Sequence, residues 1–159
     1  MTWDEVCDDP TLRDLPFKVE TNRWGEIVMS PAKSKHAVLQ GKVSFLLQQL
    51  LPQGQMSVEF PLETSDGVKV PDVVWMSSEF YAVHREQDVF TSAPEIVVEV
   101  LSEANSPAQM REKAGLFFES GAREVWLVER SGKVRFFSGL DRELVQSALC
   151  PAFPPQINL

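Results

Sequence analysis

The chain has 159 residues, of which 43% are hydrophobic and 24% are charged, and its formal net charge at pH 7 is −8. This length and composition suit one globular domain, residues 1–159, with enough apolar side chains for a core of its own. No apolar run approaches the roughly 20 residues of a membrane span. The negative net charge argues against a protein that coats nucleic acid by charge alone.

The N-terminal residues and the cysteines suggest a cytoplasmic protein. The first residues are acidic and lack the basic start and apolar stretch of a signal peptide. Cys7 and Cys150 lie near opposite ends without a Cys-x-x-Cys spacing, so a zinc or redox motif is not expected. Two reduced thiols are the favoured interpretation, and a disulfide between the two ends stays open.

The first predicted elements are a helix, a hairpin and a longer helix. Thr2 and Glu5 form a capping box for a helix from Trp3 to about Asp8. Segments 17–19 and 26–29 predict a hairpin that turns within residues 22–25. Apolar residues at three- and four-residue steps then predict an amphipathic helix over residues 34–51.

The middle of the chain predicts strands. Two β-rich runs, residues 58–62 and 68–76, flank Ser65-Asp66-Gly67 and are expected to form one hairpin. Residues 77–93 are polar, with a short helical turn expected near Glu79. The nearly unbroken β-branched run over residues 95–101 is typical of a strand covered on both faces.

The last predicted elements complete an α/β fold. Ser106, Pro107 and Gln109 are a strong helix start, and this helix is expected to run to about Ser120. Strands are expected over residues 125–129 and 133–137. The order predicts an αβββαβ core at about residues 31–138, with a mixed sheet flanked by helices and an N-terminal hairpin as an extension.

Two carboxylates stand where folding alone would not place them. Asp72 lies within the run 68–76, and Glu99 lies in the strand that looks most buried. A buried carboxylate without a partner costs several kcal/mol or takes up a proton, and a divalent cation is one natural partner. Each residue alone is more readily structural: Asp72 could begin a strand, and Glu99 could pair with Arg123 or face a sheet edge. Their occurrence in adjacent strand-like runs favours a shared site.

Lys113 is the third unusual residue. Met110 and Phe117 stand three and four residues away, so Lys113 lies on or beside the apolar face of its helix. It could be a lysine whose stem covers the core, or its ammonium could point over the end of the sheet towards the two carboxylates. Two carboxylates, a divalent cation and a lysine together suit phosphodiester hydrolysis, because the cation activates water and polarises phosphate while the lysine orients water or stabilises charge.

These residues carry a family resemblance. Pro71-Asp72, the segment 98–102, Lys113 and the segment 121–126 together resemble the Uma-type family of restriction endonuclease-like proteins, within the PD-(D/E)XK nuclease superfamily. The resemblance covers nearly the whole chain, including residues 27–31 ahead of His36 and the closing segment 151–153. It implies a restriction-endonuclease-like fold, Mg²⁺ or Mn²⁺ held by Asp72 and Glu99, a DNA substrate and a homodimer.

The resemblance also implies that the catalytic lysine has moved. In the commoner superfamily pattern it stands two residues after the glutamate, where this chain has Leu101, so Lys113 on the helix would take the role. The chain departs from the family at Glu103, Gln109 and Phe117. These departures concern residues around the Asp-Glu-Lys set and leave the set itself intact.

Further candidates surround this set. His36 matches a family histidine and could contact phosphate or a metal-bound water, or simply cap a helix; Glu59 is an additional candidate acid. A basic cluster could bind DNA phosphates or form a solvated helix face. Its members are Lys33, Lys35 and Lys42.

The leading hypothesis is a metal-dependent endonuclease that hydrolyses DNA. One alternative is a binding or scaffold protein that keeps the nuclease fold with little or no activity. Another is a phosphoesterase that acts on RNA or nucleotides.

Overall fold

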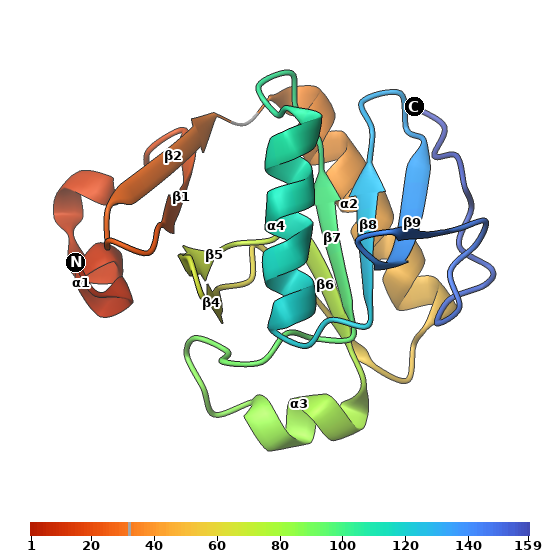
Figure 1. Cartoon of the computed structure of the whole chain (residues 1–159), viewed down its shortest axis with the longest axis horizontal. Coiled ribbons are helices and arrows are strands. Elements are labelled where there is room, and N and C mark those ends of the chain that lie inside the picture. The colour runs from red at the N-terminus through yellow and green to blue at the C-terminus, as the bar shows by residue number, and fades with distance from the viewer. Residues whose placement is uncertain (32) are drawn as a thin grey trace.

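The computed structural model describes residues 1–31 and 33–159, and it confirms a mixed α/β fold around a central sheet (Figure 1). The sheet has six strands in the order β10-β9-β8-β7-β6-β3. Its strands are β3 (Gln55–Val58), β6 (Val73–Met76), β7 (Ile96–Val100), β8 (Glu124–Val128), β9 (Val134–Gly139) and β10 (Arg142–Leu144). Only β7 and β8 of these pair in parallel, because α4 (Pro107–Glu119) connects them as a crossover.

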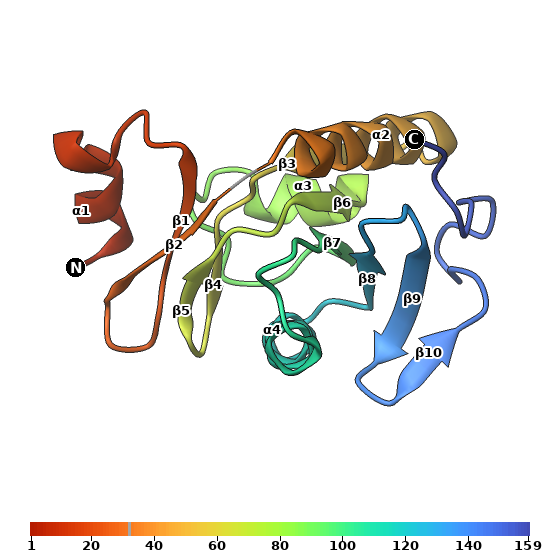
Figure 2. The same ribbon diagram turned by 90° about the horizontal axis from the view of Figure 1, so that it is seen from above.

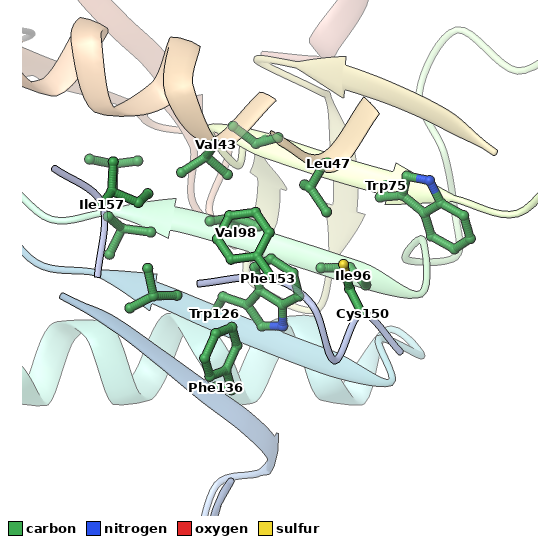
Figure 3. Close-up of a cluster of buried hydrophobic side chains, with 14 of the residues drawn as sticks. Val43, Leu47, Trp75, Ile96, Val98, Trp126, Phe136, Cys150, Phe153 and Ile157 are labelled. Carbon is green, nitrogen blue, oxygen red and sulfur yellow. The ribbon is translucent and has the colours of Figure 1, made fainter. Parts of the chain in front are cut away.

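Helices cover both faces of the sheet. In Figure 2, α2 (Ser34–Leu50) lies on one side of the strands and α4 on the other. The face under α2 holds a cluster that includes Val43, Leu47, Val98 and Trp126, and the C-terminal tail closes it with Phe153 (Figure 3). The face under α4 holds a second cluster built around Phe117. Both faces of β7 are therefore buried, as its β-branched sequence predicts.

The helix boundaries follow the predicted signals. The capping boxes Thr2/Glu5 and Ser106/Gln109 are both formed, at α1 (Trp3–Asp8) and α4. Gly121 follows α4 with φ +112°, a conformation that residues with a side chain rarely adopt. Helix α3 (Ser78–His84) is longer than the predicted single turn. Strand β10 at the edge of the sheet was not predicted.

The predicted hairpin of residues 58–62 and 68–76 is wrong in its extent. The turn at Ser65-Asp66-Gly67 joins only β4 (Leu62–Thr64) and β5 (Gly67–Lys69), which form a separate two-stranded sheet, whereas β3 pairs directly with β6. Each run is interrupted by a proline, Pro61 or Pro71, which has no N–H to donate to a strand. Glu59 adds a bend with φ 49°.

The N-terminal hairpin is a two-stranded sheet that docks on β5. It consists of β1 (Phe17–Thr21) and β2 (Ile27–Pro31). The N–H of Val68 donates to Thr21 Oγ1 at 2.9 Å, and Lys69 Nζ donates to the carbonyl oxygen of Thr21 at 2.9 Å. These buried bonds fix the hairpin against the domain.

The cysteines and the helices can now be compared with the sequence-based predictions. Both cysteines are free thiols, with Cys7 exposed and Cys150 in the core. Among the described helices, none combines the length and the apolar character that crossing a bilayer requires.

Candidate active site

Strand register brings Asp72 and Glu99 together. In the antiparallel pair of β6 and β7, Val73 lies opposite Val98, so the same register continued by one residue places Asp72 opposite Glu99. Directly opposite residues point to the same face of a sheet. The N–H of Val100 donates to Asp72 Oδ2 at 2.7 Å, which fixes the Asp72 carboxylate against β7.

Lys18 of the N-terminal hairpin lies between the two carboxylates. Its Nζ is 2.7 Å from Asp72 Oδ1 and 3.9 Å from Glu99 Oε2. The side chains of Asp72 and Glu99 are only 1% and 6% exposed, so both charges are removed from water. A cationic group therefore occupies the position between the two acids.

Lys113 reaches the same place from α4. Its Nζ is 3.3 Å from Glu99 Oε1 and 3.1 Å from Glu20 Oε2. Glu20, from β1, is itself buried and accepts a hydrogen bond of 2.6 Å from the N–H of Val70. The ammonium of Lys113 is thus held between two fixed carboxylates.

His36, near the start of α2, completes the cluster. Its Nε2 lies 3.3 Å from Asp72 Oδ2. This contact raises the pKa of His36, although burial opposes the shift. The imidazole of His36 therefore points to the Asp72 carboxylate and is largely shielded from solvent.

The two acids have opposite pKa shifts. Burial alone would raise the pKa of Asp72, but His36 and Lys18 outweigh it and hold this pKa well below its usual range. Burial raises the pKa of Glu99 to about 7, against the opposing influence of Lys113 and Lys18. Such a pair of carboxylates with separated pKa values is a frequent feature of active sites.

Both lysines remain protonated at neutral pH. Burial favours the neutral amine, but Glu99 and Asp72 outweigh it at Lys18, and Glu99 and Glu20 outweigh it at Lys113, so both pKa values are raised. Lys113 can therefore orient water or stabilise negative charge as a cation, but it is not a neutral base.

The arrangement suits a cation by charge and by geometry. Three carboxylates, Glu20, Asp72 and Glu99, face two ammonium groups, so one negative charge is left for a proton or a cation to balance. Asp72 Oδ1 and Glu99 Oε1 are buried, and each faces an ammonium group, Lys18 Nζ at 2.7 Å and Lys113 Nζ at 3.3 Å.

Only two carboxylates would ligate directly. Within residues 1–31 and 33–159, no three His, Cys, Asp or Glu side chains are placed to hold a metal ion together. A cation here would take its other ligands from water or substrate, as magnesium commonly does. The cavity that these residues line has about 40 Å³, room for an ion and a few waters but not for a nucleotide.

The other predicted site residues lie away from this cavity. Glu59 is exposed and is not among the residues that line it. Lys33 pairs with Glu103 at 3.0 Å on the surface, Lys35 is exposed, and Lys42 donates to the carbonyl oxygen of Asn158. The basic cluster is thus a solvated helix face in this structure.

Each departure from the family pattern has a local structural role. Glu103 pairs with Lys33 and Arg130, Gln109 closes the cap of α4, and Phe117 is a fully buried core residue. None of the three removes a member of the Asp-Glu-Lys set.

The sequence reasoning missed Lys18 and Glu20. Both lie on β1, two residues apart, so they point to the same side of the strand. The available signal was an oppositely charged residue at this spacing, with Lys18 inside the predicted strand 17–19 and Glu20 directly after it. Nothing in the local sequence indicated that the hairpin would lie against the site, because the hydrogen bonds that dock it join residues 47 to 50 positions apart.

Comparison with known proteins assigns the family. Residues 10–151 match the model of the Uma2 family, described as "Putative restriction endonuclease". The chain belongs to the Uma2 family. No curated protein matches the chain.

A solved structure supports this Uma2 fold. It is a crystal structure of "a putative nuclease belonging to DUF820" from Anabaena variabilis. The two chains are 18% identical and superpose with a TM-score of 0.73 over 92% of this chain and 84% of the other. At this identity the likeness concerns the fold, and it confirms the predicted nuclease-like α/β architecture.

Proposed function

We propose that this Uma2 protein is a metal-dependent endonuclease that hydrolyses phosphodiester bonds in DNA. The observation that carries the proposal is the convergence of Asp72, Glu99 and Lys113 from three separate elements, with the Lys113 Nζ 3.3 Å from Glu99. Family membership supports nuclease chemistry in general. We assign Asp72 and Glu99 as ligands of Mg²⁺ or Mn²⁺ and Lys113 as the catalytic lysine.

The protein's own residues divide the work in this proposal. A cation bound here would polarise the phosphate and lower the pKa of an attacking water. Lys113 orients that water and stabilises the negative charge that develops, because Glu20 and Glu99 hold its ammonium in place. The Val100 N–H fixes one oxygen of Asp72, and His36 contacts the same carboxylate as a positioning residue.

Plasmid nicking tests the proposal directly. Supercoiled DNA incubated with Mg²⁺ or Mn²⁺ should be nicked by the wild-type protein and not by Asp72→Asn or Lys113→Met. Lys133→Met is the matched control, because it removes an exposed lysine that does not line the cavity and has no proposed role in binding DNA. Equal activity in all four proteins would reject the proposed site.

A specific observation favours a second function, a nuclease-fold binding or scaffold protein without activity. Lys18 already lies between the two carboxylates and neutralises part of their charge. A calorimetric titration of the protein with Mn²⁺ separates the two functions. The endonuclease requires binding that Asp72→Asn abolishes, whereas a scaffold needs no binding.

The substrate and the assembly need separate measurements. Lys33 and Lys35 lie at the start of α2, on an exposed surface, and are our candidates for phosphate contacts together with Lys42. A panel of duplex DNA, RNA and nucleotides tests DNA against the other phosphoester substrates. One small domain cuts one strand at a time, so we propose a homodimer, which sedimentation equilibrium tests.

A further inference from the structure

A second cavity of about 310 Å³ lies beside the active site, between α4 and the strands β8 and β9. This volume is at the lower end of the range of small-molecule sites. Figure 2 shows α4 end-on, with β9 and β10 curving past it. Asn105 lines both this pocket and the small catalytic cavity, so the two spaces adjoin.

Strand register fixes how the pocket lies relative to the catalytic carboxylates. Glu99 on β7 pairs with Leu127 on β8, and Leu127 pairs with Arg135 on β9. Leu127 and Arg135 both line the pocket. Neighbouring strands are about 4.8 Å apart, so the pocket floor extends from about 5 to about 10 Å beyond Glu99. A nucleotide attached to a phosphate at the active site spans such a distance.

The apolar part of the pocket is suited to a flat ring. Met110, Ala114 and Leu127 are buried and form its base, and Phe118 and Phe137 are partly exposed aromatic walls. Aromatic side chains of this kind stack on nucleobases with little dependence on sequence.

The polar groups are few, and they lie around this apolar surface. Asn105 Oδ1 accepts hydrogen bonds from the N–H and the hydroxyl of Ser102, which orients its amide at the boundary of the two cavities. The side chain of Glu129 has no hydrogen bond or ion pair within the described residues. Its carboxylate can accept a hydrogen bond from a ligand.

The arginines of the pocket are held in place. Arg135 lies over the ring of Phe137, 5.2 Å from its centre, and makes two hydrogen bonds with Glu143, at 3.0 and 2.8 Å. Arg111 donates to Asp141 at 2.8 Å. Each guanidinium group at the rim is therefore held in place by a carboxylate.

We propose that this pocket binds the base of a nucleotide next to the scissile phosphate, with preference for bases that carry an exocyclic amino group. This inference rests on the proposed endonuclease function. Glu129 accepts from an amino group such as that of cytosine, whereas thymine offers a carbonyl oxygen at the same position. A base enters such a pocket only when it is out of the stacked duplex. The substrate is accordingly a single strand or a locally unpaired nucleotide.

The test is an NMR titration of the ¹⁵N-labelled protein with dCMP and, separately, with dTMP, without metal. We expect saturable amide shifts at Asn105, Leu127 and Glu129, with a lower Kd for dCMP than for dTMP. Phe118→Leu keeps an apolar side chain but removes the stacking ring, so the Kd for dCMP should rise about 5-fold or more. Phe45→Leu is the matched control, because Phe45 is an exposed phenylalanine on α2, away from this pocket.

Glu129→Gln provides a second variant that does not alter the packing. Because an amide can accept from an amino group or donate to the thymine oxygen, the difference between dCMP and dTMP should disappear. Shifts that are absent from the pocket, equal affinities of the wild type for both nucleotides, or equal effects of Phe118→Leu and Phe45→Leu would each overturn the proposal. If Phe118→Leu does not fold, Glu129→Gln decides.

The NMR titration measures nucleotide binding without any cleavage of DNA, so it can fail or succeed separately from the nicking assay. A protein that nicks plasmid DNA but shows no pocket shifts retains the proposed endonuclease function and loses the base-binding pocket. A protein with the expected shifts but without nicking retains a nucleotide pocket and loses the endonuclease.

Discussion

Replacing Lys18 by methionine tests whether its ammonium neutralises the two buried acids. Lys18 Nζ lies 2.7 Å from Asp72 Oδ1, and the Lys18 side chain is 15% exposed. Removing one partner of a buried ion pair costs about 3–5 kcal/mol. His36 and Lys113 still contact the acids, so we expect the lower end of this range, a loss of about 3 kcal/mol in the free energy of unfolding without divalent metal.

Magnesium should reverse part of this loss. A ligand that binds only the folded state stabilises it by RT ln(1 + [L]/Kd), about 2.7 kcal/mol at one hundred times Kd. In Lys18→Met the cation no longer competes with an ammonium, so magnesium should stabilise this variant more than the wild type.

Urea unfolding, monitored by tryptophan fluorescence to which the buried Trp75 and Trp126 contribute, measures both effects with EDTA and with magnesium. Lys33→Met is the control, since its ion pair with Glu103 is exposed and should contribute less than about 1 kcal/mol. Equal stability of Lys18→Met and the wild type in EDTA, or equal stabilisation of both proteins by magnesium, would refute this role of Lys18.

Three further predictions concern other buried charges. The raised pKa of Glu99 stabilises the fold below its ordinary value of 4.5, and this contribution is lost as the pH rises through about 7. In urea unfolding at a series of pH values, the wild type should therefore lose stability relative to Glu99→Gln between about pH 4.5 and 7; parallel curves would contradict the shift. Lys113→Met should reduce nicking about 10²- to 10³-fold, the range seen when one group that stabilises transition-state charge is lost. A reduction of less than about 10-fold would contradict the catalytic role. Glu124 accepts hydrogen bonds from Trp126 Nε1, Ser147 Oγ and the N–H of Leu149, so the amide nitrogen of Glu124→Gln would place a donor against a donor. We expect this variant to lose about 1–3 kcal/mol in the free energy of unfolding. An unchanged free energy would show that the carboxylate is not needed there.

Local signals in the sequence were enough for most of the fold. The caps of α1 and α4 and the β-branched run of β7 each depend on residues within a few positions, and all formed as predicted. The prediction failed where two prolines and the bend at Glu59 divided apparently continuous β-rich runs. Edge strand β10 is only three residues long, and its pairing with β9 includes a register shift, so it carried too weak a pattern to be recognised.

The functional site depended on longer-range information. Asp72, Glu99 and Lys113 could be selected because a charged residue within an apolar pattern is visible locally. Lys18 and Glu20 could not be placed in the site, since only the docking of the N-terminal hairpin on β5 brings them there.

Glu124 marks the limit of reasoning from buried carboxylates alone. It is as buried as Glu99 and also lies in a central strand, yet it accepts hydrogen bonds from Trp126 Nε1, Ser147 Oγ and the N–H of Leu149, at 2.7 to 3.0 Å. Its partners are neutral donors that tie the C-terminal segment to the sheet, and no ammonium group in the described chain forms an ion pair with it. The distinction therefore lies in the partners: Asp72 and Glu99 face ammonium groups across a small cavity, which is why we propose them as metal ligands, whereas Glu124 is enclosed by N–H and O–H donors.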